Sequence, residues 1–363
     1  MRLLSIRADA GKSGQAQHGG RSRDVARALK FAAIGVACVW SVGGVSSALA
    51  QLPPAPAGVE VTTIHGIEFS TIGNPGNRTP TDQENQTRIN PFGSVPYTYR
   101  MARTELTAAQ YLPFIQAYAE AFPSQNLTFV ERSSFIRRAG PGEPLAVIPG
   151  YENWAVDVPF GMAMRYCNWL HNDRVGGVSG IEGGVYDMSL VRFDSEGRYS
   201  DTITRSANAR FWLPSIDEWV KAGYYDPNRY GPGQDGYWYY PHRSELPPVP
   251  GVDSDISQSI VNWGPVVRFP HAQSPWGLFD VSGSSFEWSD ATRDMPSAGR
   301  LLLGSGIGAP DYLDELPNSF SVFTLGGSSS LGGIRIATVP TPGTAAAAYV
   351  CLFCLTLRPR RIL

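Results

Sequence analysis

Apolar side chains recur at helical spacing in three stretches of the chain. In the first, Thr107 and Gln110 have the spacing of a capping box, which marks the start of a helix. Pro113 is compatible with the first turn of such a helix. The apolar positions of this stretch are Tyr111, Phe114, Ile115 and Tyr118. The pattern predicts a helix that begins just after Thr107.

The second and third stretches also begin with helix-start signals. Pro159 is suited to open a helix, and Ser215 and Glu218 form another capping box. The apolar positions of the second stretch are Phe160, Ala163, Met164, Cys167 and Leu170. The third continues through Trp219 and Ala222. Three short helices are therefore predicted.

Elsewhere the apolar runs are short and interrupted by Gly, Pro and Asp. Residues 66–69 have the composition of a strand, and the Gly- and Asn-rich residues 73–77 indicate a turn cluster after it. Residues 78–94 are polar, and we expect a mobile surface loop there. With 39 glycines and 29 prolines, the pattern predicts a loop-rich α+β domain over residues 51–338.

The N-terminal 50 residues have the three parts of a secretory signal peptide. A basic region precedes an apolar or small stretch over residues 31–45, and small residues then end in Ala48-Leu49-Ala50. We expect cleavage after Ala50, so that the mature chain starts at Gln51. A buried core helix is the alternative interpretation of the apolar stretch.

Residues 339–363 form a second distinct end. The apolar run 344–357 is shorter than the roughly 20 residues of a membrane span, and Arg358, Arg360 and Arg361 follow it. The arrangement resembles the PEP-CTERM sorting tails of bacteria, which implies an exosortase-type membrane protease as a partner. A plain hydrophobic anchor remains the alternative. Either way, the expected location is the bacterial cell envelope, cell surface or exterior, with membrane contact only through this tail.

The charge of the chain argues against nucleic-acid binding, and its cysteine content excludes a disulfide within the domain. The 30 Lys and Arg nearly balance the 32 Asp and Glu, so the formal charge is -2 and no nucleic-acid partner is expected. Of four cysteines, only Cys167 lies between the two ends. No disulfide can form within residues 51–338, and a lone cysteine on an apolar helix face is typical of a packing residue.

Six segments together resemble the formylglycine-generating, or sulfatase-modifying factor, family. Segment 210–219 (Arg-Phe-Trp-Leu-Pro-Ser-Ile-Asp-Glu-Trp) is similar to the family's Arg-Leu-Pro-Thr-Glu-x-Glu-Trp. Segment 277–288 (Gly-Leu-Phe-Asp-Val-Ser-Gly-Ser-Ser-Phe-Glu-Trp) stands where the family has Gly-Leu-x-Asp-Met-x-Gly-Asn-Val-Trp-Glu-Trp. The others, in chain order, are 99–111, 165–170, 300–305 and 333–337. The resemblance implies a single domain with a distorted C-type-lectin-like core.

The resemblance also implies chemistry that this chain lacks. Enzymes of the family bind copper(I) through two cysteines that follow the segment matching Gly304-Ser305. No cysteine, histidine or methionine occurs between residue 305 and the tail, so copper is not expected, because a soft monovalent ion prefers thiolates. Within this chain, Trp212, Trp219, Phe286 and Trp288 are expected in the core, and Arg335 in an ion pair with Glu105 or Glu287.

Calcium is the one cofactor that the resemblance supports. The family holds calcium at the turn that corresponds to Asp280, Gly283, Ser285 and Glu287, through carboxylate and carbonyl oxygens of the kind that calcium takes. A hydrogen-bonded turn without metal is the alternative.

Two functions follow from these observations. The first is a non-catalytic binding module at the cell surface or matrix, with a peptide or glycan as its ligand. The second is an oxidoreductase-type enzyme of the same family with altered chemistry, built on carboxylates such as Asp311 and Asp314.

Overall fold

The computed structural model describes residues 51–88, 90–193, 199–200, 203–255, 264–292, 300–320, 322–323 and 331–340. The predicted signal peptide and the apolar part of the sorting tail lie outside these residues. Within them, no helix is long and apolar enough to cross a membrane.

The described chain is a mixture of short helices and short strands. The helices are α1 (Ala108–Ala121), α2 (Thr128–Ser133), α3 (Phe160–His171), α4 (Val178–Glu182) and α5 (Ile216–Tyr224), with 3-10 turns η1 (Met188–Leu190) and η2 (Asp311–Asp314). The strands are β1 (Val61–Ile64), β2 (Ile67–Ile72), β3 (Tyr99–Ala102), β4 (Ile136–Arg138), β5 (Leu145–Val147), β6 (Arg192–Phe193), β7 (Tyr199–Ser200), β8 (Phe211–Trp212), β9 (Tyr225–Gly231), β10 (Gln234–Tyr237), β11 (Glu287–Thr292), β12 (Arg300–Leu303), β13 (Val322–Phe323) and β14 (Ala337–Thr338). This content confirms the α+β class.

The largest sheet joins the two ends of the described chain. Its strand order is β1-β2-β3-β14-β8, and each neighbouring pair is antiparallel. The last strand therefore lies in the interior of the sheet, where Ala337 pairs with both Met101 and Trp212. This insertion carries Arg335, two residues earlier, into the centre of the domain.

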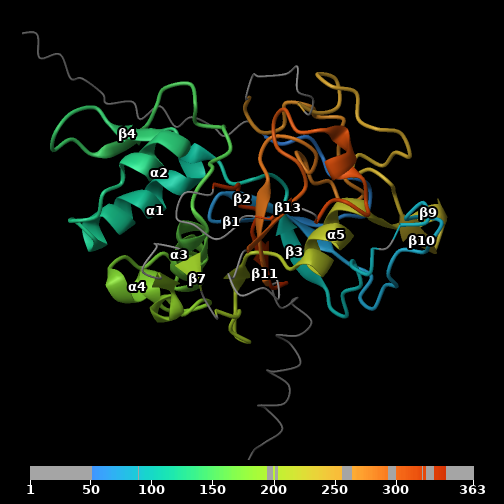
Figure 1. The fold of residues 1–363 in the computed structure, drawn as a ribbon, viewed down its shortest axis with the longest axis horizontal. Helices are drawn as coiled ribbons and strands as arrows, with labels where there is room; N and C mark the ends of the chain where they lie inside the picture. The colour runs from blue at the N-terminus through green and yellow to red at the C-terminus, as the bar shows by residue number, and fades with distance from the viewer. Residues whose placement is uncertain are drawn as a thin grey trace, which may run out of the picture. The chain divides into compact units, whose positions relative to one another are not determined.

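The helices lie on different sides of the sheet strands. In Figure 1, α1 to α4 lie to the left of β2 and β3, whereas α5 and the β9–β10 hairpin lie to the right. A second sheet, β11-β12-β13, supplies the strand that begins at Glu287. Helices α1 and α3 pack through aromatic rings, with Tyr111 and Tyr166 at 5.8 Å and Phe114 and Trp169 at 5.7 Å between centroids.

All three predicted helices are confirmed. Both capping boxes are complete, since Thr107 pairs with Gln110 and Ser215 with Glu218, and Pro159 is the N-cap of α3. Helices α2 and α4 were not predicted, because stretches of six and five residues are too short to show a helical period.

The described part of residues 78–94 is a surface loop without helix or strand, as predicted, but three of its polar side chains, Glu84, Asn85 and Asn90, are buried. Glu84 is only 6% exposed and accepts hydrogen bonds from Arg78 at 2.6 Å and from the backbone N–H of Tyr237 at 3.0 Å. Asn90 is also buried and donates to the carbonyl of Leu316. The buried polar side chains therefore anchor the loop to the fold, whereas others, such as Thr79, Asp82 and Gln86, are exposed as expected.

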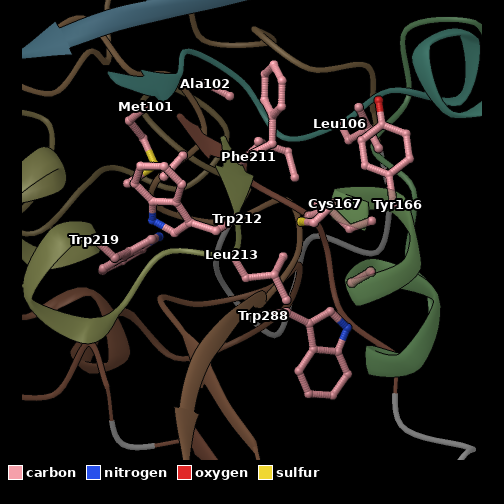
Figure 2. Packing of buried hydrophobic residues seen from close by; sticks show 14 of the residues in the cluster. Met101, Ala102, Leu106, Tyr166, Cys167, Phe211, Trp212, Leu213, Trp219 and Trp288 are labelled. Carbon is pink, nitrogen blue, oxygen red and sulfur yellow. The ribbon is translucent and has the colours of Figure 1, made fainter. Parts of the chain in front are cut away.

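Cys167 is a packing residue, as predicted. Its side chain is fully buried, and Figure 2 shows it pointing from α3 toward Phe211 and Leu213, with Leu106 nearby. Burial raises the pKa of the thiol well above its usual value, and the charge of Asp290 adds to the effect. The thiol is therefore uncharged and unreactive at neutral pH. The expected core tryptophans are buried, and Phe286 is half-buried against them.

Candidate functional site

A tight turn of residues 282–285, Ser-Gly-Ser-Ser, connects Val281 to the segment that enters β11; we name it the serine turn. Gly283 and Ser284 both have left-handed backbone angles, with φ of 82° and 57°. A Cβ on Gly283 would lie 2.2 Å from Oδ1 of Asp255. Glycine is therefore required here, both for the backbone angle and for the close approach of the carboxylate.

A buried ion pair stands beside the serine turn. Arg335 Nη2 lies 2.6 Å from Glu287 Oε1, and both side chains are almost inaccessible to solvent. Trp219 Nε1 donates to the second carboxylate oxygen at 2.6 Å. The remaining guanidinium donors reach carbonyls of Ala102 and Phe279. Of the two partners expected for Arg335, Glu287 is the hydrogen-bonded one.

Two further carboxyl groups hold the end of the turn. The backbone N–H of Ser285 donates to Glu105 at 3.0 Å, and the Ser285 hydroxyl donates to Asp157. Burial raises the pKa of Glu105 well above its usual value, with Glu287 and Asp280 as negative neighbours. Burial also raises the pKa of Asp157, to about 6, against the hydrogen bond from Ser285. The direction of both shifts favours the protonated acids, which limits the negative charge near Glu287.

A second group of polar side chains meets the start of the turn. The Ser282 hydroxyl donates to Asp314 Oδ2 at 2.5 Å, and the N–H of Gly283 donates to Ser305 Oγ at 2.8 Å. The N–H of Ser284 donates to Asp255 Oδ1 at 2.6 Å. These contacts join three loops that are far apart in the sequence.

In the part of the chain that the structure describes, Asp314 is the member of this group that has an oxygen without a hydrogen-bond partner. It is fully buried, and its Oδ1 has no hydrogen-bond partner among the described residues. Burial raises its pKa to about 7, although the nearby hydroxyls of Ser282 and Ser305 oppose the shift. Asp311, three residues earlier, is exposed. A substrate could therefore reach Asp311 but not Asp314, which does not favour an enzyme that uses both carboxylates.

The four residues of the predicted calcium site lie in or beside the turn, but the two carboxylates among them already have hydrogen-bond partners. Glu287 is bound by Arg335 and Trp219, and Asp280 Oδ2 accepts the N–H of Val267 at 2.7 Å. Arg335 also lies 3.3 Å from the Asp280 carbonyl oxygen. A guanidinium thus already supplies the positive charge between Asp280 and Glu287, and the fit for calcium at these four residues is poor. Calcium at this set stays a prediction.

Sequence reasoning missed the carboxyl groups that complete the polar cluster: Glu105 as a partner of the turn, Asp157 and Asp255. They come from irregular segments without any period that would place them. The described residues contain no group of three or more His, Cys, Asp or Glu arranged to hold a metal ion. Any cation here would therefore depend on hydroxyl and carbonyl oxygens as well as carboxylates.

A cavity of about 440 Å³ lies elsewhere in the domain. Its walls come from residues 51–53, the β1–β2 hairpin, the start of α1, Asn153 and residues 265–267. Apolar side chains such as Leu52 and Val266 stand beside polar ones such as Glu68. The volume falls in the usual range of ligand sites, which is roughly 300 to 1,000 Å³.

In comparisons with known proteins, no family model and no curated protein sequence matches this chain. Among solved structures, Treponema denticola variable protein 1 is 16% identical with a TM-score of 0.41, covering 78% of this chain and 99% of that one. CarF is 16% identical with a TM-score of 0.44, covering 77% and 100%. PvdO from Pseudomonas aeruginosa is 15% identical with a TM-score of 0.43, covering 79% and 100%. These likenesses are too distant to carry an argument about function.

Proposed function

We propose that residues 51–338 form a sulfatase-modifying-factor domain that acts as an exported, non-catalytic binding module. The observation that carries this proposal is the position of the thiol. Cys167, the only cysteine between the two ends of the chain, is buried on α3. Ser305, in the segment that precedes the family's copper-binding cysteines, instead accepts a hydrogen bond from the backbone N–H of Gly283 and lies close enough to Asp314 to lower its pKa. This site has the oxygen donors of a structural turn and no soft ligand.

The spatial arrangement of the resembling segments supports the family assignment. Glu105, Trp219, Glu287, Ser305 and Arg335 come from five different segments. The four other than Glu287 each contact either the serine turn or the Glu287 carboxylate. The resembling segments, which lie far apart in the sequence, therefore meet at the serine turn and Glu287.

The cavity of about 440 Å³ is the binding site that we propose for a peptide or glycan. The side chains of Glu68, Thr104 and Asn153 offer polar contacts, and residues 52–53 and 265–266 offer an apolar wall. Export through the secretory route, with Gln51 as the mature N-terminus, and exosortase-dependent sorting of residues 339–363 complete the proposal.

The absence of thiol chemistry is tested with copper(I) and a cysteine-containing peptide. We expect neither stoichiometric copper binding nor aldehyde formation on the peptide by mass spectrometry, because the soft ligands are missing. Tight binding of one copper ion per chain together with aldehyde product would refute the non-catalytic assignment.

The binding role is tested on peptide and glycan arrays. Thr63 lines the cavity and Thr62 does not, because neighbouring residues of a strand point to opposite faces. We expect Thr63→Trp to block the cavity and abolish any array signal, whereas Thr62→Trp keeps it. Equal signals from the two variants would show that the ligand binds elsewhere, and no signal from the unmodified chain would count against the module.

A further inference from the structure

The serine turn separates two buried groups of carboxylates with different charge compensation. On one side, Glu287 has Arg335 as its counter-ion at 2.6 Å. On the other side, the negative charges of Asp255 and Asp311 act on Asp314 and raise its pKa further. Burial raises the pKa of Asp255 and the charge of Arg268 opposes the shift, whereas the largest charge effects on Asp314 come from the two aspartates.

Neither protonation state of Asp314 satisfies its free oxygen. The ionised form would leave a buried negative charge with Oδ1 unpaired, and the protonated form with the proton on Oδ1 would leave an unpaired donor. A buried polar group without a partner destabilises the folded state. The vicinity of Oδ1 therefore calls for a bound species that offers positive charge or hydrogen bonds.

The surrounding atoms are hard oxygen donors held by the backbone. Ser282 Oγ lies 2.5 Å from Asp314 Oδ2 and 3.2 Å from Ser254 Oγ. Ser254 Oγ also donates to the Ser282 carbonyl at 2.9 Å. Gly283, which has no side chain, leaves the space into which the Asp255 carboxylate projects. Carboxylate and hydroxyl oxygens from irregular loops match the flexible, oxygen-only coordination that calcium takes.

We propose that Asp255 and Asp314, together with the hydroxyl oxygens of Ser282 and Ser305, bind one calcium ion beside the serine turn. This set shares no residue with the four predicted from the sequence, and it does not require the Arg335–Glu287 pair to open. Two carboxylates neutralise the two charges of the ion. The ion would join loop 254–255, the turn and η2, which no regular secondary structure connects.

The test measures the melting temperature of the purified full-length chain in calcium, in magnesium and in a calcium chelator. A ligand that binds only the folded state stabilises it, so we expect calcium at 100 times its dissociation constant to raise the melting temperature by about 5 °C. Magnesium at the same concentration should do much less, because it requires stricter octahedral geometry. An identical melting temperature in calcium and chelator would overturn the proposal.

Matched variants assign the site. Asp314→Asn and Asp255→Asn should each abolish the calcium response, whereas Asp311→Asn, on the same 3-10 turn but exposed, should keep it. Glu287→Gln should also keep it. Loss of the response in Glu287→Gln with retention in Asp314→Asn would overturn this proposal and place calcium at the set predicted from the sequence.

A spectroscopic measurement covers the case in which an aspartate variant does not fold. Terbium(III), a calcium surrogate, should emit when the tyrosines are excited. Tyr224 can transfer energy to it, because the Tyr224 hydroxyl donates to the Asp314 carbonyl at 3.0 Å. Calcium should compete this emission away, and Ser282→Ala should weaken the apparent calcium affinity about tenfold, the effect of losing roughly 1.4 kcal/mol. Emission that calcium cannot displace, or an unchanged affinity in Ser282→Ala, would contradict the proposed ligands.

Discussion

Two buried regions of this domain are built on opposite principles. Around Cys167, helix α3 and β8 contribute apolar and aromatic side chains that pack against one another (Figure 2). Around the serine turn, the buried atoms are carboxylates, hydroxyls and one guanidinium from loops. In the first region each side chain is replaceable by another of similar volume, whereas in the second each group depends on a particular partner.

The buried charges make the second region a candidate site, whereas the apolar packing of the first region does not suggest one. Buried charge is unfavourable unless it is paired and hydrogen-bonded. A domain that could be stabilised by apolar packing alone gains no evident stability from collecting Glu105, Asp255 and Asp314 beside one turn. Their presence indicates a structural or binding role that apolar residues cannot perform.

Removal of the buried cation, Arg335, should have the largest effect on the stability of the second region. Arg335→Met leaves Glu287 buried without a counter-ion, and we expect the free energy of unfolding to fall by about 3 to 5 kcal/mol in chemical denaturation. Adding Glu287→Gln should recover part of the loss. Arg210→Met provides the control, because Arg210 pairs with Asp173 on the exposed surface. A loss in Arg335→Met no larger than in this control would contradict the assigned importance of the pair.

The second prediction concerns the close approach of Asp255 to Gly283. Gly283→Ala adds left-handed strain of about 1 to 2 kcal/mol and overpacking against the carboxylate, so we expect a total loss of about 3 kcal/mol. Gly76 is a matched control, since its φ is 77° and a Cβ there would meet nothing within 4 Å. Gly76→Ala should show only the strain. Equal losses in the two variants would mean that the turn can move away from Asp255.

The third prediction uses Asp290, a buried acid near the first region, whose charge adds to the rise in the pKa of the Cys167 thiol. Burial brings the pKa of Asp290 to about 7. An acid whose folded pKa exceeds its unfolded value binds more protons when folded. Its contribution to stability is therefore complete below about pH 4 and is lost as the pH rises to about 7.

We expect Asp290 to make the free energy of unfolding about 2 kcal/mol larger at pH 5 than at pH 8. Asp290→Asn should flatten that part of the pH profile, measured by denaturant titration at each pH. Asp187→Asn serves as a control, because Asp187 is exposed and its pKa is lowered by hydrogen bonds from Ser189. A profile that stays equally steep in Asp290→Asn would assign the pH dependence to other buried acids.

The two regions also differ in how far the sequence predicts them. Capping boxes and the helical period correctly located α1, α3 and α5, and the same period placed Cys167 in the core. The pairing of Arg335 with Glu287 was one of two alternatives, because both acids belong to resembling segments. These features depend on neighbours a few residues apart or on one long-range pairing.

The polar region was predicted only in part, for a physical reason. Its members come from loops whose approach is set by the whole fold, chiefly by the insertion of β14 between β3 and β8. Asp255 and Asp314 lie 59 positions apart in the printed sequence, and no local pattern relates them. Within the polar segment 78–94, the burial of Glu84 was missed for the same reason, since this residue looks like a surface residue until its partner Tyr237 is known.

The smallest expected effect tests the apolar side of the comparison. Cys167→Ala removes one sulfur atom from a well-packed site, and we expect a loss of about 1 kcal/mol. Cys167→Ser keeps the volume but buries a hydroxyl, so it should destabilise the fold more than alanine does, unless a hydrogen-bond partner is in reach. A reducing agent should leave the melting temperature of either variant and of the parent unchanged, because no second cysteine lies between residues 51 and 338. If serine were tolerated better than alanine, the site around Cys167 would hold a polar partner, and the contrast between the two buried regions would be one of degree.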